Sequence, residues 1–269
     1  MRKPKILLNI IKSLIENDGH ITSRELPRSK RTQIKQIHNA IILLEKLGVI
    51  KVDGDLDKNK FTISLVRDFQ FLILEQKVKV IFHEDRSKTK SFKFHAIALK
   101  DTIREIEDNS YWSVDDKVKT RIEVYNPKRE HGKIIVDRIE LGSQKATIKL
   151  HLDPPSRMGE RILHGFKVIQ TNYFTFTQKE TIERYGDPEM MDGLQVLQPT
   201  LLAVLEIKFP NNYEFIDVKA EKYDLVIVDG PQMPSTIPNH RLHIKKNGIY
   251  LKIVHPQIGY YFLAWKSAN

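Results

Sequence analysis

The chain has 269 residues, 41% of them hydrophobic, which is enough for two domains or one large one with a proper core. Its formal net charge of +10, from 44 Lys and Arg against 34 Asp and Glu, favours an acidic partner such as nucleic acid. The absence of cysteine excludes a disulfide framework and a thiolate metal site, and no apolar run approaches the ~18 residues that span a bilayer. We therefore expect a soluble, cytoplasmic protein without a signal peptide.

The first 66 residues carry most of the excess positive charge and show a helical pattern. They hold 13 Lys and Arg against 7 Asp and Glu, whereas the other 203 residues hold 31 against 27. Apolar residues at helical spacing predict a helix from about residue 4 to Gly19, and a short second helix is predicted at residues 22–27. A third helix, over residues 29–47, starts with cations and amides and ends in an apolar stripe. Two β-prone runs joined by a turn follow between residues 49 and 66.

This order of helix, short helix, long helix and hairpin is typical of a winged helix-turn-helix. The stretch NAIILLEKLGVIKVD, residues 39–53, closely resembles the end of the recognition helix and the start of the wing in regulators of the MarR and ArsR kind. The resemblance covers residues 4–66 and implies that the chain binds double-stranded DNA, with the polar start of the third helix in the major groove. The alternative is a winged domain that docks a protein.

The resemblance also implies roles for the polar residues of this region. The candidate base contacts are Thr32, Gln33 and Gln36, because amides and hydroxyls can pair with base edges. The candidate phosphate contacts are the cations Arg28, Lys30, Arg31, Lys35, Lys58 and Lys60.

Residues 67–117 form a connecting segment that offers a candidate dimer contact, so a homodimer is one expectation for the chain. From Val118 onward, alternating apolar and polar residues with recurrent turns predict an antiparallel β-sandwich. The expected fold class is therefore α+β, with a winged helix-turn-helix domain at residues 1–66 and a β-rich ligand- or partner-binding domain at residues 118–269. Aromatic residues of the second domain usually fill a core, but they could line a ligand pocket: Tyr173, Phe174, Phe176, Tyr260, Tyr261 and Trp265.

Few patterns in the sequence carry chemistry. No zinc-protease spacing of His, no phosphate-binding glycine loop and no hydrolase elbow occurs, so neither a metal nor a cofactor is favoured. One pattern is similar to the PD-(D/E)xK nucleases, with Asp192 in one β-run and Glu206 and Lys208 in the next. In that arrangement carboxylates bind Mg²⁺ and the lysine polarises water or phosphate. The other explanation is that Glu206 and Lys208 lie on the wet face of a half-buried strand.

These observations favour a non-enzymatic DNA-binding protein, a transcriptional regulator whose β-rich domain senses a small molecule or binds a protein. One alternative is a Mg-dependent, site-specific DNA endonuclease with Asp192, Glu206 and Lys208 as its catalytic residues and Asp192 and Glu206 as its metal ligands. Another is a non-catalytic adaptor of a nucleic-acid complex.

Overall fold

The structure is a computed structural model that describes residues 3–26, 31–58, 60–66, 68–111, 118–125, 127–142, 145–224, 234–235, 237 and 240–269. Its helices are α1 (Lys3–Glu16), α2 (Arg31–Lys46) and α3 (Gln178–Tyr185). Its strands are β1 (His20–Thr22), β2 (Ile50–Asp55), β3 (Lys60–Leu65), β4 (Phe71–Phe82), β5 (Lys88–Ala98), β6 (Glu105–Tyr111), β7 (Lys119–Val124), β8 (Lys128–Arg129), β9 (Lys133–Leu141), β10 (Lys145–Asp153), β11 (Arg161–Thr171), β12 (Glu189–Val196), β13 (Leu202–Lys208), β14 (Phe215–Tyr223), β15 (His240–Lys245), β16 (Gly248–Val254) and β17 (Gly259–Ser267).

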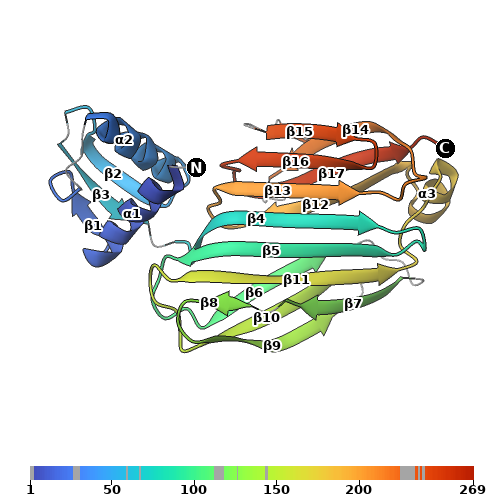
Figure 1. The fold of residues 1–269 in the computed structure, drawn as a ribbon, viewed down its shortest axis with the longest axis horizontal. Helices are drawn as coiled ribbons and strands as arrows, with labels where there is room; N and C mark the ends of the chain where they lie inside the picture. Colours follow the sequence, from blue (N-terminus) through green and yellow to red (C-terminus); the bar gives the residue numbers. More distant parts are fainter. Residues whose placement is uncertain are drawn as a thin grey trace.

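The segment before β4 forms a small unit at one end of the molecule (Figure 1, blue). In it, α1 and α2 pack against a three-stranded antiparallel sheet of order β1-β3-β2. Both helices carry apolar residues every three to four positions, and this stripe is buried, as Leu14 and Ile41 show. Leu72 and Leu99 of the β-rich body complete the same core, so the unit is packed against the end of the body.

The prediction of a winged helix-turn-helix in this unit is wrong. The short helix expected at residues 22–27 is not found in the part that the structure describes, because residues 23–26 form turns. A helix-turn-helix needs such a helix directly before its recognition helix. Strand β1 takes up the expected start of this helix, because Thr22 is extended and pairs with Thr62 of β3.

The body of the molecule is built on one eight-stranded sheet (Figure 1). Its order is β15-β16-β13-β4-β5-β11-β7, with β8 beside β11. Alternate residues of the central strands point into the core, as Val78, Val80 and Phe82 of β4 do. Paired strands in this sheet run antiparallel except β4 and β13, which run parallel with Leu205 opposite Val78.

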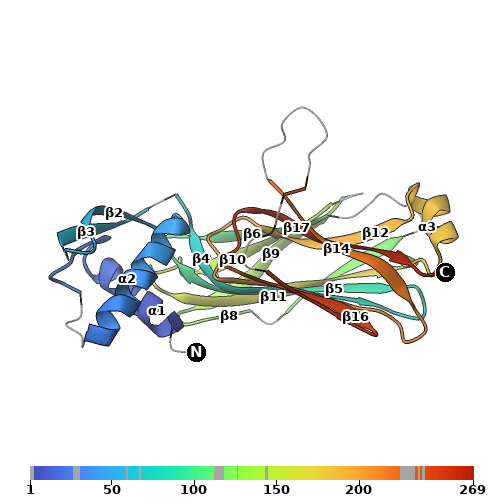
Figure 2. The ribbon, with the colours of Figure 1, turned by 90° about the horizontal axis from the view of Figure 1, so that it is seen from above.

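Two separate three-stranded sheets cover one face of the large sheet (Figure 2). One has the order β6-β10-β9 and the other the order β12-β17-β14. The core between the layers contains Phe166 of the large sheet, Leu150 of β10 and Trp265 of β17, which are all fully buried. Since β6 and β12 are edge strands, the second layer is divided along its length.

The expected fold class, a winged helix-turn-helix followed by an antiparallel β-sandwich, is therefore also wrong. The described part of the chain is mostly β, its largest sheet contains a parallel pair, and its second layer consists of two sheets. Residues 67–117 supply β4, β5 and β6 to the same sheets as residues 118–269. The domain boundaries at residues 66 and 117 stay a prediction.

No helix among the described residues is long and apolar enough to cross a membrane.

Candidate ligand-binding site

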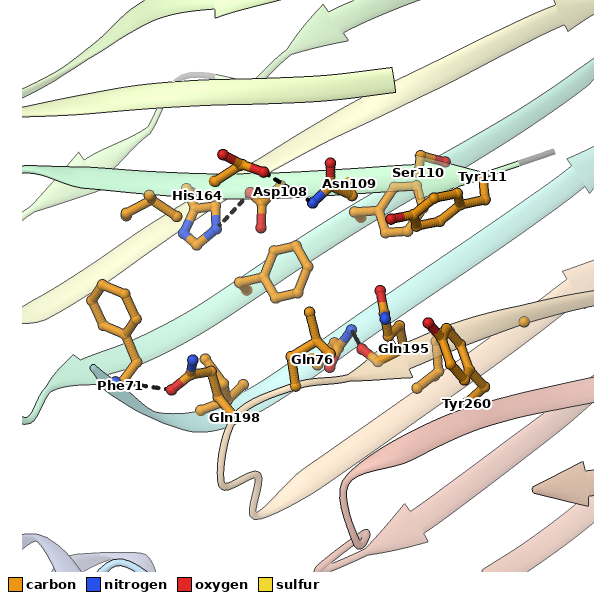
Figure 3. A pocket seen from close by; sticks show the side chains of 18 of the residues that line it. Phe71, Gln76, Asp108, Asn109, Ser110, Tyr111, His164, Gln195, Gln198 and Tyr260 are labelled. Carbon is orange, nitrogen blue, oxygen red and sulfur yellow. Dashed lines mark hydrogen bonds and ion pairs between the residues drawn. The ribbon is translucent and has the colours of Figure 1, made fainter. Parts of the chain in front are cut away.

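A cavity of about 290 Å³ opens where the second layer is divided, and we call it the inter-sheet groove (Figure 3). Strand β6 forms one wall, β12 forms the other, and residues of β4, β5 and β11 form the floor. Phe92 and Phe94 make the floor apolar, and Ile106 and Leu194 extend the apolar surface up the two walls. Polar side chains from all five strands interrupt this surface.

His164 lies on the floor and faces the groove (Figure 3). It lies two residues after Ile162 and two before Phe166, which are both buried, so the alternation of side chains along β11 turns it inward. Its ring stacks on Phe94 with the ring centroids 4.9 Å apart.

Asp108 of β6 is the charged neighbour of His164. His164 Nε2 lies 3.0 Å from Asp108 Oδ2, but the two groups are not aligned for a hydrogen bond. The two groups therefore form an ion pair (Figure 3), and of the two ring nitrogens of His164 only Nδ1 has neither a hydrogen bond nor an ion pair among the described residues. Buried polar atoms are normally paired, so Nδ1 is an exception, and a ligand could supply its partner.

Carboxamides tie the floor of the groove to β12. Gln76 Nε2 donates to the backbone oxygen of Gln195 at 2.8 Å, and the backbone N–H of Phe71 donates to Gln198 Oε1 at 3.3 Å. The first bond occupies a backbone acceptor of β12, and the second uses the side chain of Gln198, which follows β12 in the chain. The wall made by β12 is therefore partly saturated by the chain itself.

A cluster of buried charges borders the groove. Asp192 of β12 lies between Lys88 and Lys90 of β5, with both ammonium nitrogens 2.7 Å from its carboxylate oxygens. Burial raises the pKa of Asp192, but the two cations outweigh this effect and hold that pKa at about 2. Burial lowers the pKa of Lys90, against the attraction of Asp192. With two cations for one anion, the cluster is one counter-charge short, and Lys90 lines the groove.

The nuclease candidates do not assemble. Asp192 points into the core between the layers, whereas Glu206 lies on the opposite face of the large sheet. Glu206 forms ion pairs with Lys77, at 3.1 Å, and with Lys208, at 3.7 Å. The structure thus separates the Asp from the Glu-x-Lys pair, and Glu206 and Lys208 are residues of a solvated sheet face.

The candidate DNA contacts are placed as follows. Arg28 and Lys30 lie outside the described residues, and so do the side chains of Arg31, Thr32 and Gln33. Lys35 and Gln36 are exposed on α2, and Lys60 is exposed at the start of β3. Lys58 lies in the turn between β2 and β3, where its ammonium is 3.3 Å from Asp55.

Most of the candidate aromatic pocket is core. Phe174, Tyr261 and Trp265 are fully buried between the layers, and of the six aromatic candidates only Tyr260 lines the inter-sheet groove. The residues that sequence reasoning missed are His164 and Asp108. The available signal was that His164 alternates with the apolar residues Ile162, Phe166 and Val168 in RILHGFKVIQT, which predicts that it points inward.

Comparison with known proteins gives likenesses in fold. No protein-family model matches the chain, and no curated protein matches it. One similar solved structure is a proposed protease from Parabacteroides distasonis, with 8% identity, 73% of this chain and 40% of that chain covered, and a TM-score of 0.48. Leukotriene A4 hydrolase from Saccharomyces cerevisiae has 13% identity, 74% and 29% coverage and a TM-score of 0.37. An M1 zinc metallopeptidase from Deinococcus radiodurans has 8% identity, 73% and 42% coverage and a TM-score of 0.33.

These likenesses transfer no activity to this chain. It spans less than half the length of each of these three structures, and the TM-scores are all below 0.5. The described residues contain no group of three or more His, Cys, Asp or Glu side chains that could hold a metal ion.

The expectation of a DNA-binding transcriptional regulator is corrected by the fold. The N-terminal unit lacks the short helix of a helix-turn-helix in its described part, and this motif was the basis of the expectation. The endonuclease hypothesis is also wrong, because Asp192 and Glu206 lie on different faces and do not form one site. The hypothesis of a nucleic-acid adaptor depended on the winged domain, so it is wrong for the same reason as the regulator.

Proposed function

We propose that this protein is a ligand-binding module that holds a small organic molecule, with an apolar body and polar groups, in the inter-sheet groove. One observation carries the proposal. The His164 side chain is only 5% exposed, faces the groove, and has one ring nitrogen, Nδ1, with neither a hydrogen bond nor an ion pair among the described residues. A buried polar atom without a partner costs about 1–3 kcal/mol, and a ligand that bonds to Nδ1 recovers that free energy.

The groove has the size and surface of a small-molecule site. Ligand pockets typically measure about 300–1,000 Å³ and are lined by apolar side chains with a few convergent polar groups. At about 290 Å³ the inter-sheet groove lies close to the lower end of this range. Phe92 and Phe94 would hold the apolar body, while His164 and Lys90 would bind oxygen or nitrogen atoms. The proposal needs no metal and no cofactor.

The decisive variant removes the buried pair and the unpartnered Nδ1 without opening a hole. In the double variant His164→Leu, Asp108→Leu, both members of the buried pair and the unpartnered Nδ1 are replaced by apolar groups, so we expect a melting temperature equal to or above that of the parent. We also expect the variant to lose ligand binding. Binding would be measured by saturation-transfer NMR with a set of small aromatic amides and carboxylates. A variant that is less stable and still binds every fragment would refute the assignment of these atoms to a ligand site.

A steric pair of variants locates the ligand. Leu197 lines the groove and is 46% exposed, whereas Leu141 of β9 is 53% exposed and lies outside it. Leu197→Trp should narrow the groove and abolish fragment binding, and the matched control Leu141→Trp should leave it unchanged. Equal binding by the two variants, or no fragment bound to the parent, would overturn the proposal.

We also propose that the protein is cytoplasmic. The support is compositional: a chain without cysteine can form no disulfide in an oxidising compartment, and this composition agrees with a reducing cytoplasm.

A further inference from the structure

We infer that the occupant of the inter-sheet groove is a short extended peptide that adds to the free edge of β6 as an extra strand. The inference rests on the proposed function and names the chemical class of its ligand. It starts from the hydrogen-bonding register of β6.

The register shows which backbone groups of β6 face the groove. Leu152 of β10 follows the last residue of that strand that pairs with β6. Its N–H donates to the backbone oxygen of Arg104 at 2.8 Å, and two residues earlier Leu150 lies opposite Ile106. Hydrogen-bonded and non-bonded pairs alternate along antiparallel strands. Ile106, and with it every second residue to position 110, therefore turns its N–H and C=O toward β10. The alternate residues Glu107, Asn109 and Tyr111 turn their backbone N–H and C=O groups toward the groove.

This edge of β6 has no partner in the described part of the chain. Its sheet ends there, in the order β6-β10-β9, and no backbone hydrogen bond to another element involves Glu107, Asn109 or Tyr111. Three N–H donors and three C=O acceptors thus stand in strand register along one wall of the cavity. An extended peptide offers matching donors and acceptors at the same repeat, which is the basis of binding by strand addition.

The opposite wall explains why the peptide pairs with β6 and not with β12. The backbone oxygen of Gln195 in β12 already accepts a hydrogen bond from the Gln76 side chain. This bond occupies one backbone acceptor of β12, whereas Glu107, Asn109 and Tyr111 of β6 have no backbone hydrogen bond to another element among the described residues. The peptide therefore lies along β6 with its other edge toward β12.

The surroundings of β6 also define the side chains of the peptide. In an added strand, alternate side chains point to opposite faces. One set would rest on Phe92 and Phe94 beside His164, where apolar side chains fit. The other set would lie on the outer face beside Glu105 and Glu107, both exposed, where charge complementarity favours Lys or Arg. Within the described residues, the cation nearest Glu107 is Lys149, at 4.0 Å, so this carboxylate is weakly paired.

A backbone-methylation series tests the strand geometry without altering the protein. The probe is a fluorescent pentapeptide, Lys-Leu-Lys-Leu-Lys, acetylated and amidated at its ends, with its Kd measured by fluorescence polarisation. Analogues carry one N-methyl group at each position in turn. We expect binding to fall at least tenfold at alternate positions and to change little at the positions between them. Equal losses at all positions, or no loss at any, would overturn strand addition.

A matched pair of variants tests the edge itself. Proline removes a backbone donor and is tolerated on the free edge of an edge strand, so Glu107→Pro should keep the parent melting temperature within a few degrees. We expect it to weaken the pentapeptide at least tenfold. Glu107→Gln keeps the donor and removes only the charge, and should weaken it no more than about threefold at low salt. Equal affinities of the two variants would overturn the role of the edge. If Glu107→Pro does not fold, the methylation series decides.

The peptide and the proposed function can fail separately. If fragments bind the parent and are lost in Leu197→Trp while the pentapeptide does not bind, the groove is a ligand site and the peptide is the wrong class. If neither binds, both proposals fall. Pentapeptide binding that survives in Leu197→Trp would place the peptide elsewhere and overturn the inference.

Discussion

The buried cluster around Asp192 offers the sharpest test of the reasoning from structure. Its carboxylate is 3% exposed and lies 2.7 Å from Lys88, whose side chain is 4% exposed, and 2.7 Å from Lys90, whose side chain is 11% exposed. Asp192→Asn keeps the shape of the side chain and removes its charge. The two ammonium groups then remain in the core without a counter-charge, and the amide nitrogen faces one of them.

The expected cost follows from burial. Removing one member of a buried ion pair typically costs about 3–5 kcal/mol, because the remaining charge is left desolvated and unpaired. For a chain somewhat above 250 residues, each kcal/mol lowers the melting temperature by about 2–4 °C, so we expect Asp192→Asn to melt roughly 10 °C below the parent. An exposed pair gives the contrast: Lys51 and Asp53, at 3.3 Å, are both more than half exposed. Asp53→Asn should cost about 0–1 kcal/mol.

Differential scanning calorimetry of the parent, Asp192→Asn and Asp53→Asn at pH 7 measures both effects. Replacing the whole cluster, Asp192 with Leu and Lys88 and Lys90 with Met, should restore much of the lost stability, since a buried ion cluster can be exchanged for apolar residues of similar volume. If Asp192→Asn melts within 2 °C of the parent, the cluster is not held by its charges, and the account of Lys90 beside the groove is refuted with it.

Three further outcomes are expected. The pKa of Asp192 is about 2 in the folded chain and 3.8 without its surroundings, so the folded state binds fewer protons than the unfolded state between these pH values. The free energy of unfolding should therefore fall by about 2 kcal/mol as the pH falls from 3.8 through 2. Urea titrations at several pH values should show this fall in the parent and not in Asp192→Asn. Glu160→Gln breaks a buried pair with Arg129, held at 2.6 and 2.7 Å, and should cost about 3–5 kcal/mol in calorimetry, whereas Glu140→Gln, in an exposed pair, should cost less than about 1. Trp265→Ala removes a fully buried ring whose Nε1 donates to Tyr213, and equilibrium unfolding should show a loss of about 3–5 kcal/mol.

Periodicity along the chain was enough to find most elements near their places. Two of the three expected N-terminal helices are present, because an apolar residue every three to four positions can be buried only by a helix of that pitch. Alternation likewise predicts which residues of a strand point inward, and it placed Glu206 and Lys208 on a common wet face. The short helix at residues 22–27 was not found because Thr22 is the last residue of β1 and pairs with Thr62 of β3, a contact between distant positions that no local pattern predicts.

Alternation says which face of a strand is buried and nothing about which strand lies beside it. Only the tertiary structure pairs β4 with β13, more than 100 residues later, and divides the second layer so that β6 and β12 have free edges. Only there does Asp192, a plausible metal ligand by its sequence context, meet Lys88 and Lys90 from another sheet. His164 and Asp108, 56 positions apart in the numbering of the chain, are brought within 3.0 Å in the same way. The charge, burial and function of such residues depend on contacts between distant strands, so they were decided by packing, whereas the local elements were determined by the sequence itself.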